Sequence, residues 1–328
     1  ALAGVVGQGL ARSLHLAPAG WRAQVGASWA WLESAPSPGS RRVLTLADAA
    51  CPASLLQPED PPLLLYASGV FPDAWPRSVA MVGSRNPTAQ GQENARQFAR
   101  SFAQAGLAVV SGLALGIDSA AHEGALEGAA AGQPATLAVV GTGLDRVYPR
   151  RNLDLAHRIA QRGLLLSEYP IGTPPLAENF PRRNRIIAAL GEGTLVVEAA
   201  LASGSLITAR FAAEQGKDVF AIPGSIHSPQ SRGCHALIKQ GAKLVETAQD
   251  VLEELSPGST PVAGAAAPAT EPSVPLLDAM GFDPMGLDAL VARTGTSPAQ
   301  LQAQLLELEL AGRVARLPGG VYQRMARA

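Results

Sequence analysis

The stretch Ser78-Val79-Ala80-Met81-Val82-Gly83-Ser84-Arg85-Asn86-Pro87-Thr88 decides the fold. Its apolar run, residues 79–82, is typical of a strand that is buried on both faces of a parallel sheet. Gly83 ends the run, and a helix is expected over residues 90–104, where Phe98 and Phe102 lie four apart on one face. The order strand, turn, helix predicts the opening unit of an α/β domain.

The turn in this stretch has the chemistry of an anion site. Ser84 offers a hydroxyl and Arg85 a guanidinium, just ahead of a helix N-terminus. Backbone N–H groups, the positive end of a helix dipole and a fixed positive charge together suit a phosphate oxygen. Gly83, Ser84 and Arg85 are therefore predicted to bind phosphate.

Further apolar runs repeat at the spacing of a doubly wound sheet. They are residues 63–66, 107–111, 135–140, 164–167, 194–197, 219–222 and 243–245. Helical segments fill the gaps, so the sequence predicts an α/β fold of the Rossmann-like, doubly wound type with a mostly parallel sheet covered on both faces. Ligands of such sheets bind beyond the carboxyl ends of the strands.

Polar and basic residues gather at these carboxyl ends. Ser111 and Gly112 follow the second strand of the domain, and the turn Ser203-Gly204-Ser205 precedes a helix that holds Thr208 and Arg210. The densest basic run, Phe180-Pro181-Arg182-Arg183-Asn184-Arg185, carries an aromatic residue. Together with Tyr148 and Tyr169, such a rim can hold backbone phosphates and stack bases. An anchor for its loop in the core is the alternative role for Phe180.

Four segments are expected along the chain. Residues 1–62 form a small helical N-terminal module, either a degenerate helix-hairpin-helix or a generic cap, and residues 63–256 form the Rossmann-like domain. Residues 257–273 are rich in Ala, Pro, Gly, Ser and Thr and are expected to be a flexible linker. In residues 274–328 the order helix, helix, β-hairpin indicates a winged-helix domain, with Leu301, Leu305 and Leu308 on its core side.

Composition excludes several classes of protein. The 328 residues are 47% hydrophobic, yet no apolar run reaches the roughly 20 residues of a membrane span. The N-terminus lacks the order of a signal peptide, so a cytoplasmic location is the default expectation. Net charge is −1, so any basic surface must be local. There are only three lysines, so the positive charge is almost entirely arginine, which suits bidentate phosphate contacts, although a GC-rich genome also favours arginine.

The motifs of common cofactor and metal sites are missing. No Gly-x-Gly-x-x-Gly follows Val82, and no Gly-x-x-x-x-Gly-Lys-Ser/Thr is present. Cys51 and Cys234 make neither a disulfide framework nor a zinc spacing, and adjacent Cys234 and His235 cannot both reach one ion. We therefore expect no cofactor, no metal and no enzymatic activity.

Five ordered motifs resemble the DNA-processing protein A (DprA, also called Smf) family from residue 63 to residue 255. They are Met81-Val82-Gly83-Ser84-Arg85; Ser111-Gly112 with Gly116-Ile117-Asp118 and His122; Gly141-x-Gly143 with Tyr148-Pro149 and Asn152; Phe180-Pro181-x-Arg183-Asn184-Arg185-Ile186-Ile187; and Ser203-Gly204-Ser205-Leu206-Ile207-Thr208-Ala209. The segment after the linker looks like the winged-helix domain that many members carry.

The resemblance implies a recombination mediator with an extended Rossmann-like domain. Such a protein binds single-stranded DNA, protects incoming strands during natural transformation and loads the RecA recombinase, usually as a homodimer through that domain. By motif, Gly83, Ser84 and Arg85 would grip phosphate and Phe180 would contact a base. The remaining matches would line the groove, hold its loop or complete the anion pocket: Arg183, Arg185, Asn184, Ser203, Gly204, Ser205 and Thr208.

The sequence departs from the family pattern just before Phe180. Many members have a lysine there, where this chain reads Leu176-Ala177-Glu178-Asn179. Arg182, Arg210 and Lys239 are the candidates to replace that phosphate contact.

Two other functions compete with this interpretation. One is a nucleotide-processing enzyme of the nucleoside monophosphate glycosidase class, for which Glu198 occupies a suggestive place, although the Pro-Gly-Gly turn of such enzymes is missing. The other is a reader of duplex DNA that uses the winged helix. Its expected recognition helix over residues 297–312 carries Glu307 and Glu309 and no basic residue, so protein contact or a modest assist in DNA binding is favoured.

Overall fold

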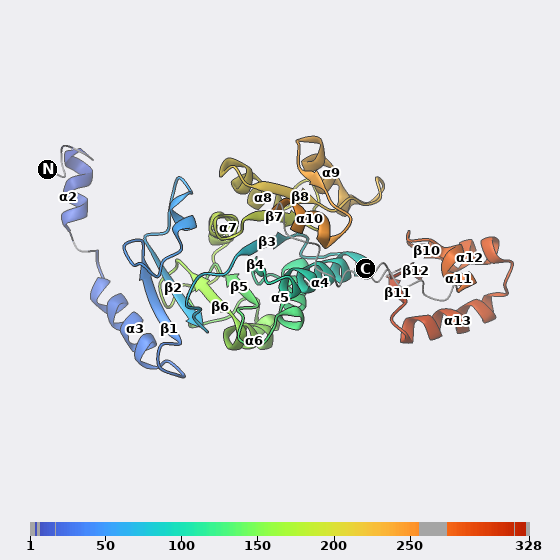
Figure 1. Cartoon of the computed structure of the whole chain (residues 1–328), viewed down its shortest axis with the longest axis horizontal. Coiled ribbons are helices and arrows are strands. Elements are labelled where there is room, and N and C mark those ends of the chain that lie inside the picture. Colours follow the sequence, from blue (N-terminus) through green and yellow to red (C-terminus); the bar gives the residue numbers. More distant parts are fainter. Residues whose placement is uncertain (1–3, 5–6, 17, 256–273, 318, 326–328) are drawn as a thin grey trace.

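The structure is a computed structural model that describes residues 4, 7–16, 18–255, 274–317 and 319–325. The expected linker, residues 257–273, lies outside the described residues. Figure 1 shows a central sheet with helices on its two faces and a separate small C-terminal unit. No helix of the described ranges is both long and apolar enough to cross a membrane.

The N-terminal and sheet region contains these elements in chain order: α2 (Gln8–His15), α3 (Trp21–Glu33), β1 (Arg41–Thr45), the 3-10 helix η1 (Ala53–Leu56), β2 (Leu64–Gly69), β3 (Ser78–Val82), α4 (Ala89–Gln104), β4 (Ala108–Ser111), α5 (Ile117–Gly128), β5 (Thr136–Val139), η2 (Arg150–Asn152), α6 (Leu153–Arg162), β6 (Leu164–Ser167), α7 (Asn179–Leu190), β7 (Gly193–Val196), α8 (Ser205–Glu214), β8 (Asp218–Ala221), η3 (Pro229–Ser231), α9 (Arg232–Lys239), β9 (Lys243–Leu244) and α10 (Ala248–Leu255).

Nine strands form one sheet in the order β1-β2-β6-β5-β4-β3-β7-β8-β9. The seven neighbouring strands β6-β5-β4-β3-β7-β8-β9 are all parallel to one another. At one edge of the sheet, β2 pairs antiparallel with β6, and β1 pairs antiparallel with β2. The predicted doubly wound, mostly parallel sheet is confirmed. The chain reverses its winding between β3 and β7, and this switch point is where the sheet leaves a crevice for a ligand.

Alternation along β3 explains why its whole sequence is apolar. Val79 and Met81 pack on one face with α4, α5 and α10, and Ala80 and Val82 pack on the other face with α7, α8 and α9. The strand is therefore buried on both sides, as the run 79–82 predicts. On α4, Phe98 and Phe102 meet edge to face at a centroid distance of 6.1 Å, which confirms the helix expected over residues 90–104.

The N-terminal elements extend the sheet. The Ser28 hydroxyl on α3 is 2.8 Å from the Tyr66 hydroxyl on β2, and the rings of Trp31 and Tyr66 meet at 5.8 Å. Strand β1 lies within the stretch that the sequence assigned to the helical N-terminal module. It pairs with β2 over five residues and was not predicted, because Arg41 and Arg42 interrupt its apolar pattern.

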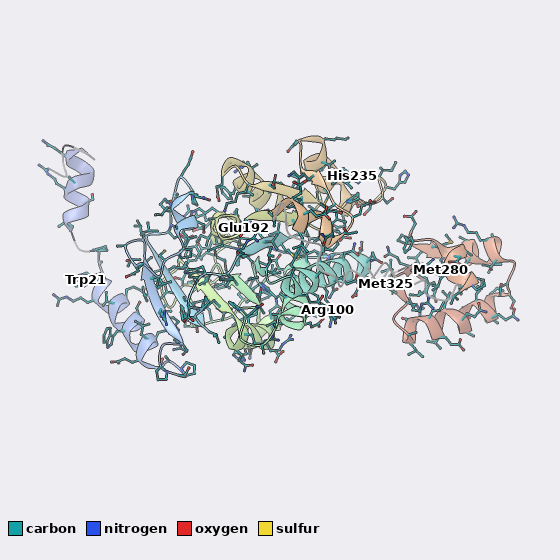
Figure 2. All side chains as sticks on the ribbon, viewed as in Figure 1. Trp21, Arg100, Glu192, His235, Met280 and Met325 are labelled. Carbon is teal, nitrogen blue, oxygen red and sulfur yellow. The ribbon has the colours of Figure 1, made fainter. Side chains whose placement is uncertain are left out.

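The C-terminal unit has its own core. It contains α11 (Pro275–Met280), β10 (Met285–Gly286), α12 (Leu287–Thr294), α13 (Pro298–Leu310), β11 (Val314–Leu317) and β12 (Val321–Arg324), with the strands in the order β10-β12-β11. Met280, labelled in Figure 2, packs there with Leu301 and Leu305. Two helices before a hairpin confirm the expected winged helix, and α11 and β10 complete it.

Candidate nucleic-acid interface

The turn after β3 is held by the loop that begins α5. The Ser84 carbonyl accepts a hydrogen bond from the Ile117 amide at 3.1 Å, and the Ser84 hydroxyl accepts one from the Asn86 amide at 3.1 Å. A Cβ on Gly83 would lie 2.6 Å from the Ile117 side chain, so only glycine fits that close approach. This packing leaves Arg85 exposed at the top of the turn.

Arg85 lies beside two aromatic rings from other loops. Its guanidinium carbon is 5.9 Å from the centre of the Phe180 ring, at the start of α7. The Phe180 ring lies 5.5 Å from that of Tyr148, with a tilt of 38° between them. Tyr148 is 48% exposed, whereas Phe180 is half-buried against Gly141. Both expected roles of Phe180, contact with a base and anchoring of its loop, are thus compatible with its position.

The small-residue turn before α8 joins the same site. The Ser205 hydroxyl donates to the Gly83 carbonyl at 2.8 Å and lies 2.9 Å from the Ser203 hydroxyl. The Asn184 amide donates to the Gly204 carbonyl at 3.3 Å, so Asn184 fixes this turn. The turns that follow β3 and β7 therefore meet at the switch point of the sheet. Thr208 is buried one turn further along α8.

Arg183 lies below this rim and does not reach the solvent. It is 4% exposed, and its guanidinium donates to the Val139 carbonyl. Burial lowers the pKa of Arg183 to about 10 in spite of the Asp118 carboxylate. Gly112 leaves room for this guanidinium, because a Cβ at that position would overlap it. The Ser111 hydroxyl is also buried and donates to the Met81 carbonyl at 2.7 Å.

Arg185 is engaged in a largely buried ion pair. Its guanidinium donates to both Glu168 oxygens, at 2.7 and 2.6 Å, and to the Asp60 carbonyl at 2.7 Å. These bonds tie α7 to the end of β6 and to the loop after η1. The arginines of the basic run thus differ in position: Arg182 is exposed, whereas Arg183 and Arg185 are buried and form hydrogen bonds within the fold.

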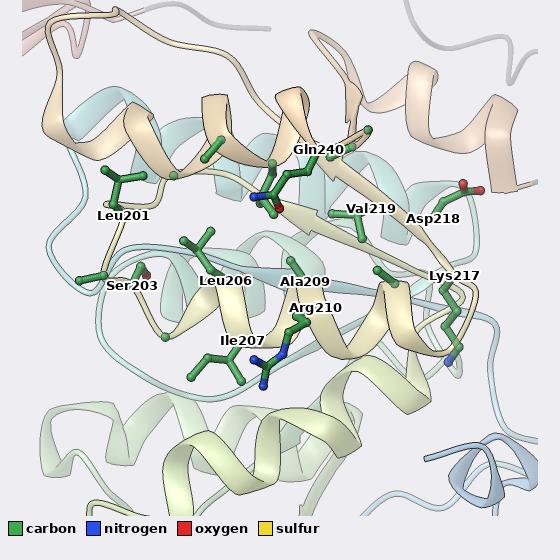
Figure 3. A pocket seen from close by; sticks show the side chains of 18 residues that line it. Leu201, Ser203, Leu206, Ile207, Ala209, Arg210, Lys217, Asp218, Val219 and Gln240 are labelled. Atoms are coloured by element: carbon green, nitrogen blue, oxygen red, sulfur yellow. The ribbon is translucent and has the colours of Figure 1, made fainter. Parts of the chain in front are cut away.

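The two other candidate cations lie on α8 and α9. Arg210 is exposed and pairs with Glu214 at 3.4 Å, and Lys239 is exposed in the last turn of α9. Arg210 also lines a groove of about 660 Å³ between these helices (Figure 3). No contact described for either residue joins it to the cluster of Arg85, Tyr148 and Phe180.

Glu198, the candidate for the rival enzyme, holds the start of α4. Its carboxylate accepts from the Thr88 amide at 2.9 Å and from the Thr88 hydroxyl at 2.5 Å. Burial raises its pKa, and the two Thr88 hydrogen bonds oppose that shift. Thr88 in turn caps α4 by accepting from the Gly91 amide at 2.9 Å. Both oxygens of Glu198 are thus used within the fold.

His122 makes the stability of this site depend on pH. It is fully buried with Nδ1 2.7 Å from the Thr136 hydroxyl, and burial, with a smaller effect of Arg183, lowers its pKa from 6.5 to about 3. Below pH 6.5, His122 becomes protonated in the unfolded chain but stays neutral in the folded protein. The free energy of unfolding therefore falls as pH falls. We expect a loss of about 1.4 kcal/mol per pH unit relative to a His122→Asn variant, measured by urea unfolding between pH 6 and pH 4. Parallel pH profiles for the two proteins would contradict this.

Three supporting residues are not among the site residues that the sequence predicts. Tyr148, which the sequence places on the rim, contacts Phe180. Glu168 and Asp118 were not expected to offset the charges of Arg185 and Arg183. Those carboxylates lie far along the chain from their partners, so only the fold brings them together.

Comparison with known proteins gives the class of the fold and site. A family model for "DNA recombination-mediator protein A" matches residues 42–256, and one for the "DprA winged helix domain" matches residues 260–320. Protein Smf of Escherichia coli is 43% identical over 84% of this chain and 75% of its own length. DNA processing protein DprA of Streptococcus pneumoniae is 47% identical over 64% of this chain and 73% of its own length.

Solved structures agree. The X-ray structure of DNA processing protein A from S. pneumoniae shares a TM-score of 0.62 and 45% identity over 66% of this chain and 75% of that chain. The Helicobacter pylori protein, whose structure was described for its single-stranded DNA binding mode, shares a TM-score of 0.57 and 33% identity over 65% of this chain and 95% of that chain. The chain is a member of the DNA recombination-mediator protein A family, also called DprA or Smf.

Proposed function

We propose that this chain binds single-stranded DNA across the rim formed by the turns after β3 and β7 and the start of α7. The observation that carries the proposal is the cluster of Arg85, Phe180 and Tyr148 beside the Ser203-Gly204-Ser205 turn. An exposed guanidinium next to partly exposed rings suits a phosphate followed by a stacked base. Gly83, Ser84 and Gly204 would let the sugar–phosphate chain approach the backbone closely. The described single-stranded DNA binding mode of the H. pylori relative supports this choice of ligand.

The buried residues have a different part in this proposal. The buried Ser111, Gly112, Arg183, Arg185, Ser205 and Thr208, with the half-buried Asn184, shape and hold the rim, while Arg85, Arg182 and Ser203 face the strand. Arg182, two residues after Phe180, is our candidate to replace the lysine of other members. Arg210 and Lys239 would contact only DNA that continues past α8.

Salt titration tests the proposal. Phosphate contacts release counterions, so the affinity for a labelled oligonucleotide should fall as salt rises. A plot of the logarithm of the binding constant against the logarithm of the salt concentration should be linear, with a slope of about −0.7 for each phosphate contact on a single strand. Preference for single strands over a duplex of the same sequence is also expected. A binding constant that does not change with salt would refute the rim as a phosphate site.

As a recombination mediator, the chain would protect incoming single strands during natural transformation in the cytoplasm and load RecA recombinase onto them. Family membership supports this role. The test is RecA filament formation on DNA coated with single-strand-binding protein. We expect the chain to shorten the lag, and no effect on the lag would remove RecA loading from the proposal while leaving DNA binding in place.

Homodimerisation through the Rossmann-like domain is also part of the proposal. The groove between α8 and α9 supports it, because Leu206, Ile207 and Leu237 line it and Leu201 at its edge is 62% exposed (Figure 3). Apolar surface of this kind is typical of protein contacts. Sedimentation of the full chain should give twice the monomer mass of 33.7 kDa, and a monomer at all concentrations would exclude the dimer.

The glycosidase alternative makes a distinct prediction. Incubation with nucleoside monophosphates would release free base, and Glu198→Gln would abolish the release. The double hydrogen bond from Thr88 to Glu198 weighs against a free catalytic carboxylate there.

A further inference from the structure

Helix α13 of the winged-helix module has two apolar faces. Leu301 and Leu305 are fully buried in the module's core, with Leu308 packed beside them. Ala299, Ala303, Leu306 and Leu310 are exposed, Leu306 by 56% and Leu310 by 82%. At 3.6 residues per turn these four lie within a stripe about 60° wide on the side opposite the core. We call them the outer seam.

The outer seam has the spacing of a coiled coil. Its members are separated by four, three and four residues, which is the spacing of consecutive a and d positions. A helix with a second apolar stripe of this kind needs a partner surface, because a globular helix usually keeps its outer face polar. Alanines in the stripe allow another helix to approach closely.

The outer seam is complementary to itself. Ala299 and Leu310 are equally far from the middle of the outer seam, between residues 304 and 305, and so are Ala303 and Leu306. If two copies of the helix lie antiparallel, each leucine therefore meets an alanine of the second copy. A parallel pair would instead stack leucine on leucine and alanine on alanine, which leaves gaps at the two consecutive alanine layers in its first half.

The flanking charges select the same arrangement. Gln300 and Gln302 flank the first half of the outer seam, and Glu307 and Glu309 flank the second half. An antiparallel pair places each glutamate beside a glutamine of the other copy, where an amide can donate to a carboxylate. A parallel pair would place glutamate against glutamate, and like charges at these positions are unfavourable.

We propose that the winged-helix module is a self-association module, in which α13 pairs antiparallel with α13 of a second copy of this chain. The interface is isologous, as a two-fold pair requires. It is also short, so it is weak alone and gains from any other contact that holds two copies together, whether a second protein interface or neighbouring positions on one DNA strand. The pairing itself needs no nucleic acid and does not depend on the rim.

Cross-linking between two single-cysteine variants of the full chain tests the proposal. An affinity-tagged Ala303→Cys protein is mixed with an untagged Leu306→Cys protein and treated with a short bismaleimide, and the parent chain gives the background from Cys51 and Cys234. We expect the mixed pair to cross-link more strongly than either variant alone, because residue 303 of one copy lies next to residue 306 of the other. Adding Leu310→Glu to both proteins should return the yield to background, whereas Gln304→Glu, the same new charge on a face away from the outer seam, should not.

Three outcomes would overturn the proposal. They are a mixed yield no higher than that of a Gln304→Cys variant, whose cysteine lies on a face away from the outer seam, a stronger yield for each variant alone, and insensitivity to Leu310→Glu. Affinity of the Leu310→Glu chain for an oligonucleotide too short to hold two copies is measured in parallel and should be unchanged. A failure of self-association is thus distinguishable from a failure of DNA binding at the rim.

Discussion

Replacing Arg85 with alanine is expected to weaken binding of single-stranded DNA by roughly ten- to a hundredfold. A hydrogen bond from an ionised donor to a phosphate contributes about 1.5–3 kcal/mol, and each 1.4 kcal/mol is a factor of ten in affinity. Arg85 is exposed and its guanidinium contacts the half-buried Phe180 ring only at 5.9 Å, so the loss of its side chain should not unfold the protein. Fluorescence anisotropy with a labelled oligonucleotide at fixed salt measures the change.

Arginine-specific geometry can be separated from charge at this position. Arg85→Lys keeps the charge and loses the planar fork that lies over Phe180, so we expect an affinity between those of the parent and Arg85→Ala. Arg100→Ala, which removes an exposed charge from α4, is the matched control and should change affinity little. In a plot of the logarithm of the binding constant against the logarithm of the salt concentration, the slope should become shallower by the value of about one phosphate contact for Arg85→Ala and should not change for Arg100→Ala.

The loss at Arg85 should be the same for every base sequence, because a phosphate contact carries no base information. Oligonucleotides of thymine, adenine and mixed sequence should therefore all lose affinity by the same factor. Phe180→Ala, in contrast, should weaken binding to an extent that varies with the base, because stacking strength does. Unchanged affinity of Arg85→Ala for all three oligonucleotides would place the DNA elsewhere on the protein.

The fold could be predicted from sequence because its signals are local. Most strands of the parallel sheet are short apolar runs bounded by glycine or polar residues, and the run at Ser78–Val82 is buried on both faces as its composition requires. The meeting of the turns after β3 and β7 also follows from topology, because carboxyl ends of parallel strands share one edge. The hydrogen bond from Ser205 to the Gly83 carbonyl follows from this rule, and Arg85 lies beside Phe180 at the same edge.

The roles of the neighbouring arginines could not be predicted in the same way. A basic run in a loop suggests a basic surface, but Arg182, Arg183 and Arg185 are all on α7, where successive residues point about 100° apart. Only Arg182 faces the solvent. The groups that hold the other two are the Val139 carbonyl on β5 and Glu168 directly after β6, and the sequence around them gives no signal of these contacts. The positive charges of Arg183 and Arg185 thus stabilise the fold beneath the rim.

Removing Glu168 should reveal how much the rim depends on those buried charges. The side chains of Arg185 and Glu168 are only 10% and 17% exposed, and the pair is bidentate. Glu168→Ala leaves a guanidinium largely out of water with only backbone acceptors and the exposed Asp60, so we expect the free energy of unfolding to fall by about 3–5 kcal/mol. Guanidinium chloride unfolding of the full chain, followed by circular dichroism, measures the loss.

The exposed pair Arg96–Glu127 is the matched control, because it is also bidentate but its side chains are 47% and 37% exposed. Glu127→Ala should cost at most about 1 kcal/mol, since water replaces the lost carboxylate. The double variant Glu168→Leu with Arg185→Met removes both buried charges and should recover most of the stability that Glu168→Ala loses. It should also retain DNA binding, because neither side chain reaches the rim. Equal losses for Glu168→Ala and Glu127→Ala would mean that Arg185 finds water in the folded protein, and the assignment of Arg185 to the fold rather than to the DNA would then be wrong.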